Sequence, residues 1–292
     1  MQLLKLIKFV WQHPLNAGRK LAALQRVVKW QIASRLLPGP IAMPFVETTM
    51  LFASRGMTGA TGNWYCGLHE YREMAFVLHL LRKGEHFADV GANIGSYTIL
   101  AAGGAGARVT SVEPIPSTFA QLESNVVLNH LSGQVRACSL GLSEQSGSLK
   151  FCLGLDTVNH VLAVGETLPS IDVPVMRLDE LVGDDVPVLI KIDVEGYERE
   201  VLLGGEKTLA DPRLLAVIME TNGSGARYGV SDDELIAIMV RHGFSTFGYD
   251  PFTRELVDAG LADGNTIFIR GKSIIESRVK SARHFQLVNG TI

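Results

Sequence analysis

Short apolar segments of strand length alternate with helical segments through most of this chain, and the alternation limits the fold more than any other feature. The strand-like segments are, in order, 86–90, 109–112, 135–139, 188–192, 214–219, 244–249 and 266–269. Helical periodicity follows several of them, at 94–102, 116–129, 197–209 and 232–241. Strands and helices alternating at this length predict an α/β fold, with a seven-stranded, mostly parallel, doubly wound sheet covered by helices on both faces.

Four parts are expected along the 292 residues. They are a basic amphipathic helical extension at 1–44, a lid or hairpin with a leading helix at 45–83, the main α/β domain at 84–272 and a C-terminal tail at 273–292. Short strands between 149 and 175 are read as an insertion in the main domain.

The extension carries positive charge only. Residues 1–44 contain no acidic residue, and their basic residues are Lys5, Lys8, Arg19, Lys20, Arg26, Lys29 and Arg35. Apolar residues recur at helical spacing between these cations, which predicts two amphipathic helices. Such helices either lie on an anionic membrane surface or pack against the main domain or a second subunit, so peripheral membrane contact through residues 1–37 and a homodimer both stay open.

Composition narrows the class of protein. A formal net charge of −3 gives no global electrostatic reason to expect a nucleic-acid partner. Three cysteines without metal-ligand spacing favour a reducing, cytoplasmic setting. No apolar run approaches the roughly 20 residues that cross a bilayer, and Lys5 and Lys8 interrupt the segment that would otherwise suit a signal peptide.

A glycine turn directly follows the first strand and opens the next helix, with the sequence Asp89-Val90-Gly91-Ala92-Asn93-Ile94-Gly95. Glycine lets a backbone turn tightly and approach a ligand closely. Free N–H groups at the start of the following helix are expected to bind a carboxylate. In a doubly wound sheet this turn lies in the crevice where ligands bind.

Glu113 ends the second strand, where an acidic side chain accepts hydrogen bonds from ribose hydroxyls in nucleoside-binding sheets. The turn lacks the G-x-G-x-x-G dinucleotide fingerprint, and the chain has no G-x-x-x-x-G-K-[ST] phosphate loop. An adenosyl ligand with an amino-acid tail therefore fits better than one with a pyrophosphate. The alternatives are a structural glycine turn with Glu113 as a solvated acid, and an NAD-dependent oxidoreductase.

Five segments resemble the FkbM family of methyltransferases in order and spacing. They are FADVGANIGSYTILAA (87–102), VEPIPSTFAQLESNVVLN (112–129), LGLSEQSGSLKF (140–151), VPVMRLDEL (173–181) and LIKIDVEGYEREVLLGG (189–205). The resemblance covers residues 62–225 and implies a Rossmann-like class I methyltransferase fold. It also implies S-adenosyl-L-methionine as cofactor and methyl transfer to oxygen, often on a sugar hydroxyl of a glycan, glycolipid or natural product.

Cofactor residues are carried over from this resemblance. Asp89, Gly91, Asn93 and Gly95 would cradle the methionine end, and Glu113 would hold the ribose. Ser143, in the loop after the third strand, would lie near the adenine, with its acidic neighbour Glu144 as the alternative at this position.

The candidates on the acceptor side are Asp193, Glu220 and His160. Asp193 ends the fourth strand and Glu220 the fifth, so both should project into one crevice and can serve as a base for an alcohol. The same two carboxylates could bind Mg²⁺, which is left open because no third ligand is identifiable. Asp193 as a helix N-cap and Glu195 as a first-turn acid are the structural alternatives, and for Glu195 we prefer that role.

His160 lies in the insertion, where the N-H-V triplet resembles the family pattern, and is either a base or substrate contact or an ordinary loop histidine. Three functions are compared: an O-methyltransferase acting on a small-molecule or glycan acceptor, an NAD-dependent oxidoreductase, and a non-catalytic, membrane-associated adenosyl-binding module. The absence of an N/D-P-P-Y-type motif disfavours a nucleic-acid methyltransferase.

Overall fold

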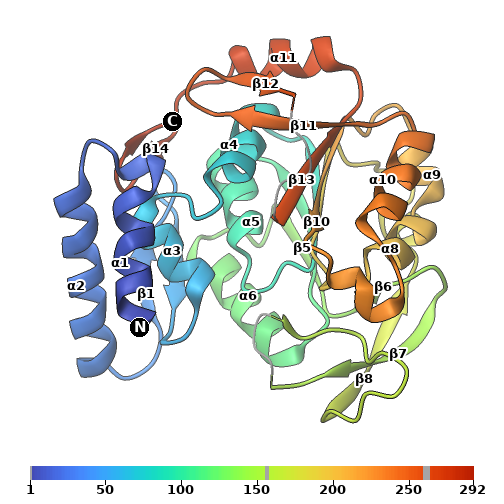
Figure 1. Ribbon diagram of the computed structural model, residues 1–292, viewed down its shortest axis with the longest axis horizontal. Coiled ribbons are helices and arrows are strands. Elements are labelled where there is room, and N and C mark those ends of the chain that lie inside the picture. Colours follow the sequence, from blue (N-terminus) through green and yellow to red (C-terminus); the bar gives the residue numbers. More distant parts are fainter. Residues whose placement is uncertain (1, 155–157, 259–263) are drawn as a thin grey trace.

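The computed structural model describes residues 2–154, 158–258 and 264–292 and is built around one mixed sheet (Figure 1). In these residues the sheet has the order β12-β11-β13-β10-β9-β3-β4-β5. Its strands are β3 (His86–Val90), β4 (Arg108–Val112), β5 (Val135–Cys138), β9 (Leu189–Ile192), β10 (Ala216–Thr221), β11 (Ser245–Asp250), β12 (Glu255–Val257) and β13 (Gly264–Ile269). The five strands from β5 to β10 are parallel, and β13 joins β10 in antiparallel fashion.

The predicted Rossmann-like, doubly wound architecture is confirmed, with one difference in the strand count. All seven expected strands are present, and the described part of the sheet contains an eighth, β12, which pairs with β11 as an edge hairpin. This strand has three residues and falls in a segment whose turn residues hide it from periodicity.

Both faces of the sheet are buried, because successive side chains of its central strands enter two different apolar clusters. In β10, for example, Ile218 packs into the cluster on one face and Val217 and Met219 into the cluster on the other. Period-two alternation between two cores is what a parallel strand covered on both sides requires.

Helices cover the two faces in two groups (Figure 1). One face carries α4 (Tyr71–Leu80), α5 (Ser96–Ile99), the π-helical turn η2 (Leu100–Ala105) and α6 (Pro116–Leu128). The other carries α7 (Leu178–Val182), α8 (Glu198–Gly204), α9 (Glu206–Ala210) and α10 (Asp232–Arg241). A 3-10 turn, η4 (Ser224–Tyr228), precedes α10. The expected insertion forms a small sheet of β6 (Gly141–Leu142), β8 (Ser170–Met176) and β7 (Gly147–Cys152).

Residues 2–66 form a layer beside the sheet domain (Figure 1). This layer comprises α1 (Gln2–Gln12), the 3-10 turn η1 (Pro14–Asn16), α2 (Lys20–Leu36), the hairpin β1 (Ile41–Pro44) with β2 (Met50–Ala53), and α3 (Thr58–Cys66). One apolar cluster joins Val10 of α1 and Trp30 of α2 to Tyr65 of α3. Helix α3 therefore fixes the helix pair to the rest of the molecule. No helix in the described residues has both the length and the apolar character needed to span a bilayer.

The chain ends against the same layer. After β13 come α11 (Lys272–Lys280) and the hairpin β14 (Gln286–Leu287) with β15 (Gly290–Thr291). Phe285 and Leu287 are buried in the apolar cluster that also contains the residues of α4. The amide of Asn289 donates hydrogen bonds to the carbonyls of Leu15 and Cys66, at 2.9 and 2.7 Å.

A buried polar group of three side chains connects these segments. Asn16 is fully buried and donates to the carbonyls of Val10 and Tyr65, while its own Oδ1 accepts from Arg26 at 3.0 Å and from Asn289 at 3.1 Å. Buried polar groups are tolerated only when partnered, so Asn16 is the centre of this junction.

We expect Asn16→Ala to lower the free energy of unfolding by at least about 2 kcal/mol, because it leaves several buried groups without partners. Urea denaturation measures the change, and Gln25→Ala, on the exposed side of α2, is the control. An Asn16→Ala protein as stable as that control would contradict the role given to this junction.

Candidate active site

A cavity of about 290 Å³ lies at the carboxyl ends of β3, β4, β9 and β10. Its walls come from the loops after these strands, from the first residues of α3 and from the small β6-β7-β8 sheet. This is the crevice where ligands bind in doubly wound folds. It brings together six of the predicted site residues: Asp89, Gly91, Asn93, Glu113, Asp193 and Glu220.

The glycines of the turn after β3 are required by packing within the protein. Gly91 has a φ of +78°, and a Cβ built on it would lie 1.8 Å from the carbonyl oxygen of Asp193. Gly95 has a φ of +90°, and a Cβ there would lie 2.5 Å from Cδ1 of Leu122. Gly91 therefore lets the turn pack directly on the end of β9. Gly95, beside the cavity, lets it pack on α6.

The backbone amides of this turn already have partners. The N–H groups of Gly91 and Ala92 both donate to the carbonyl of Val112, at 3.0 and 2.9 Å. Asn93 donates to Glu113, Ile94 to the side chain of Asn93, and Gly95 to the carbonyl of Ala92. The N–H groups of residues 91–95 are therefore not available to a ligand, because the protein uses all five itself. The expectation that the start of the following helix offers free N–H groups stays a prediction for α5, which begins at Ser96.

Glu113 joins the turn after β3 to the loop after β4. Its Oε2 accepts the N–H of Asn93 and its Oε1 that of Ile115, both at 2.9 Å. The side chain is only 6% exposed and lines the cavity. Burial raises its pKa to about 7, although the two N–H donors act in the opposite direction. Each carboxylate oxygen has a second lone pair that can accept a hydrogen bond from a ligand hydroxyl.

Asp89 lies deeper beneath the same turn. Its Oδ2 accepts a hydrogen bond of 2.6 Å from Thr98, and it is 1% exposed. Burial raises its pKa to about 6. A cationic group placed over this turn would favour the ionised form of both Asp89 and Glu113.

Lys191, in β9, is the buried cation of the site. Its Nζ donates to Oδ2 of Asp193 at 2.9 Å and lies 5.4 Å from the centre of the Tyr97 ring. Burial lowers its pKa, and the attraction of Asp193, Glu70 and Glu220 outweighs burial, so the net pKa is raised. Lys191 is therefore an ammonium, and it compensates the negative charge of Asp193.

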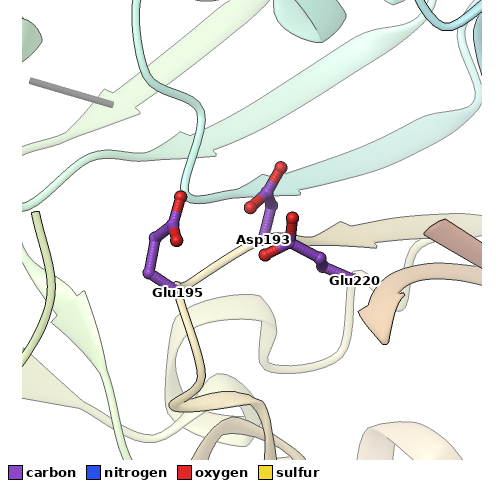
Figure 2. Close-up of side chains that lie close together, drawn as sticks. All are labelled: Asp193, Glu195 and Glu220. Atoms are coloured by element: carbon purple, nitrogen blue, oxygen red, sulfur yellow. The ribbon is translucent and has the colours of Figure 1, made fainter. Parts of the chain in front are cut away.

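Three carboxyl groups gather beside this ammonium, at the ends of β9 and β10 (Figure 2). Asp193, Glu195 and Glu220 each place an oxygen within 4.8 Å of the other two. Burial, with the nearby charge of Asp193, raises the pKa of Glu195 to about 7 and that of Glu220 to about 8. Oε2 of Glu220 is buried without a hydrogen-bond partner. The third carboxyl is Glu195, for which the sequence favoured the role of a first-turn helical acid, whereas α8 begins only at Glu198.

The contacts of Asp193 do not match the structural alternative, in which Asp193 would cap the N-terminus of a helix. The turn before α8 is instead held by Glu198, whose Oε1 accepts the N–H groups of Val194 at 3.1 Å and Gly196 at 3.2 Å. Glu195 sits in this turn with a φ of +57°. The turn thus keeps Asp193 free to pair with Lys191 and directs Glu195 toward the cavity.

Three predicted site residues, Gly95, His160 and Ser143, are not among the residues that line the cavity. His160 is buried in the insertion, where its Nε2 lies 3.2 Å from Glu166 and its Nδ1 2.8 Å from the carbonyl of Val158. Ser143 is buried beside Tyr197, and the adjacent Gly141 and Leu142 line the cavity instead. A direct role for His160 or Ser143 stays a prediction, and the geometry offers it no contact with a ligand in this cavity.

Comparison with known proteins identifies the family. Residues 89–246 match the model of the methyltransferase FkbM domain, which is more than half of the chain. The protein belongs to the FkbM methyltransferase family. The resemblance found in the sequence is thereby confirmed.

Two curated relatives and one solved structure illustrate the likeness. The chain is 31% identical to the 31-O-demethyl-FK506 methyltransferase FkbM of Streptomyces tacrolimicus, over 56% of this chain and 74% of that protein. It is 34% identical to the hexuronic acid methyltransferase AglP of Haloferax volcanii, over 44% of this chain and 53% of that protein. Among solved structures, the precorrin-6y C5,15-methyltransferase of Geobacter metallireducens matches with a TM-score of 0.41 and 11% identity, over 69% of this chain and 87% of that one.

The cavity of this FkbM family member is strongly acidic. Of the described residues that line it, six are acidic and one is a lysine, and the acidic ones are Glu70, Asp89, Glu113, Asp193, Glu195 and Glu220. Glu70 accepts hydrogen bonds from Tyr97 at 2.6 Å and from Asn265 at 3.1 Å. Charges this close together favour a ligand that brings positive charge.

Sequence reasoning missed three contributors to the cavity. Lys191 lies inside the segment 188–192 that is read as an uninterrupted apolar strand, and it is buried there all the same. Glu70 and His69 directly precede α4 and line the cavity from the start of that helix. His69 is largely buried, and burial lowers its pKa, so it is neutral near pH 7. The available sequence signal for this site was the pair Lys191 and Asp193, which are two residues apart and therefore fall on the same side of an extended strand.

We expect the stability of Glu220→Gln relative to wild type to rise with pH. The ordinary pKa of a glutamate is about 4.5, and in the folded protein that of Glu220 is about 8. Between these values the folded chain holds a proton that the unfolded chain has released, so the stabilising contribution present below pH 4.5 is lost as pH rises through 8. Glutamine is uncharged at every pH in this range, so the Glu220→Gln variant does not lose this stabilising contribution.

Urea denaturation at half-unit steps between pH 5.5 and 8.5 measures this difference. The exposed Glu123→Gln variant is the control and should follow wild type throughout. A constant difference between wild type and Glu220→Gln over the whole range would show that Glu220 does not titrate as described.

Proposed function

We propose that the protein uses S-adenosyl-L-methionine to methylate a hydroxyl group, on a sugar or another polyhydroxylated part of a glycan, glycolipid or natural product. One observation carries the proposal. The nucleoside-binding elements, Gly91 and Glu113, and the carboxyl groups at the ends of β9 and β10 line the same cavity. Donor and acceptor can therefore meet in one enclosed space, as a direct displacement requires.

The charge of the cavity supports this donor. S-adenosyl-L-methionine carries a sulfonium, an ammonium and a carboxylate, and so one net positive charge. The acidic lining attracts such a ligand, whereas the pyrophosphate of NAD needs free N–H groups or cations. The turn after β3 offers neither, since its five amides are occupied and Glu113 and Asp89 lie against it. This disfavours the alternative of an NAD-dependent oxidoreductase.

The residues fit the cofactor in three places. Glu113 has acceptor capacity for the two ribose hydroxyls, and Asp89 lies beneath the turn where the ammonium of the methionine part would sit. Ile115, Leu142 and Phe151 give the cavity an apolar wall suited to adenine. When bound, the cofactor supplies a methyl group already activated by its sulfonium.

The protein must then orient the acceptor and take up its proton. Glu220 suits the role of base, because its unpartnered oxygen faces a largely buried cluster and its pKa of about 8 is close to working pH. Asp193, fixed by Lys191, has a second oxygen that can accept a hydrogen bond from the acceptor hydroxyl. A hydroxyl held between these two carboxyls is positioned and deprotonated by the same group of residues.

The names of the relatives agree with an oxygen atom on a sugar-like acceptor, since one is named as a 31-O-demethyl-FK506 methyltransferase and another as a hexuronic acid methyltransferase. Asp193, Glu195 and Glu220 are also the residues that would hold a Mg²⁺ ion, which could orient neighbouring hydroxyls and lower their pKa. Lys191 already compensates Asp193, so the proposed reaction does not depend on such an ion.

Isothermal titration with S-adenosylhomocysteine and with NAD tests the donor. We expect wild type to bind the first and not the second. Glu113→Ala should weaken binding of S-adenosylhomocysteine by about 1 to 3 kcal/mol, the range for hydrogen bonds to a charged group. Glu123→Ala, at an exposed glutamate of α6 outside the cavity lining, is the control. Preferential binding of NAD would overturn the proposal, and unchanged affinity in Glu113→Ala would remove Glu113 from the site.

Asp193→Asn should lower turnover by about 10²-fold or more while the affinity for S-adenosylhomocysteine changes little, because the residue acts on the acceptor. A methyl-transfer screen on glycan and lipid extracts supplies the acceptor for this measurement. Wild type dialysed against EDTA should keep its turnover. Full activity in Asp193→Asn would end the case for its role, and loss of wild-type activity on chelation, restored by Mg²⁺, would assign the three carboxyls to a metal.

A further inference from the structure

The pair of helices α1 and α2 has apolar side chains on the face that is turned away from the protein. One side of the pair packs through Val10, Ala23, Val27 and Trp30. On the outward side six large apolar residues are each more than half exposed: Leu3, Leu4, Leu21, Val28, Ile32 and Leu36. Helices that are apolar on both sides are normally covered on both sides.

The outward residues form a continuous surface. Leu21, Val28, Ile32 and Leu36 are spaced by seven, four and four residues, which places them along one stripe of α2. Leu3 of α1 meets this stripe in an apolar groove that runs between the two helices. Figure 1 shows α1 and α2 side by side at one edge of the molecule, away from the sheet. A contiguous apolar surface of this kind marks an interaction site.

The positive charge of the extension indicates which partner covers this apolar surface. Six basic side chains of the extension lie on the surface or partly on it: Lys5, Lys8, Arg19, Lys20, Lys29 and Arg35. None of them forms an ion pair with a carboxylate of the described residues. The first acidic residue of the chain is Glu47. The net charge of −3 for the whole chain therefore leaves a surplus of ten negative charges on the residues after 44.

A second copy of the chain fits this surface poorly. In a two-fold dimer the same patch faces its own copy, so the cations on the α1–α2 pair of one subunit would meet those of the other without any acidic partner. An anionic bilayer meets both requirements at once. Its acyl region accepts the leucines and isoleucine, its head groups accept the lysines and arginines, and the half-exposed Trp11 suits the interface between them.

We propose that α1 and α2 form a docking surface that lays the protein on an anionic lipid membrane, with the stripe of α2 and the groove beside α1 facing the acyl chains. Helix α3 packs on α2 and also lines the cavity through residues such as Thr58 and Ala60. Docking would therefore hold the cavity at a fixed distance from the lipid surface. The proposal does not rest on methyl transfer.

Vesicle flotation of the full chain tests the surface. Wild type should float with vesicles of phosphatidylglycerol and phosphatidylcholine, and at least about tenfold less with phosphatidylcholine alone. The triple variant Leu4→Asn, Ile32→Asn, Leu36→Asn should lose at least about tenfold of the binding to the anionic vesicles. Lys5→Gln combined with Lys29→Gln should weaken binding and reduce its dependence on salt.

Val127→Asn is the matched control, because Val127 is equally exposed but lies on α6. It should float as wild type does, and titration with S-adenosylhomocysteine should be the same in all variants if they are folded. The proposal fails if wild type does not bind anionic vesicles, if the triple variant binds as wild type, or if light scattering shows a dimer that the triple variant dissociates. Failure of methyl transfer in any assay would leave the flotation result unaffected, so the two proposals are tested separately.

Discussion

The site is organised around one buried ammonium. Lys191 lies in a central strand, only 1% exposed, and an unpaired charge there would be prohibitively unfavourable. Its hydrogen bond to Asp193 compensates it, and Glu70 and Glu220 add to the attraction. In return, the ammonium lets several carboxyl groups share a small cavity. The acidic lining and the position of Asp193 follow from this balance. The raised pKa of Glu220 comes from burial and the neighbouring carboxylates, and the ammonium acts against it.

The N-terminal layer is part of the same construction. Helix α3 presents Tyr65 and Cys66 to α1 and α2, and Thr58 and Asn63 to the cavity. On the side of α3 that faces α1 and α2, Asn16 donates to the carbonyl of Tyr65 and accepts from Arg26, and these hydrogen bonds hold α3 in place. Helix α3 therefore forms one wall of the site and also contacts α1 and α2. The position of that wall depends on residues at both ends of the chain, such as Asn16 and Asn289.

Much of the fold and half of the site can be predicted from local sequence. Strand and helix periods give the seven main strands, and the turn from Asp89 to Gly95, with Glu113, can be placed by its distance from the first two strands. Lys191 could not be found in this way, because a lysine in a strand is ordinarily exposed. Glu195 depends on the turn that Glu198 holds, and the burial of His160 beside Glu166 depends on the path of the insertion. These features depend on the backbone path of turns and on burial in the folded protein, which periodicity does not encode.

The fully bonded turn after β3 has a consequence for how this fold discriminates among nucleotides. Doubly wound proteins that bind dinucleotides leave amides unpaired so that phosphate oxygens complete them. Here the carboxylate of Glu113, which follows the neighbouring strand, takes one of those amides, and the carbonyl of Val112 in that strand takes two. Oxygens of Asn93 and Ala92 within the turn take the other two. Introducing the missing glycines of the fingerprint would consequently not produce a phosphate site. A preference for dinucleotides would require the replacement of Glu113, which would remove the carboxylate that accepts the N–H of Asn93 and closes the turn. The same side chain therefore determines both ligand specificity and the local fold.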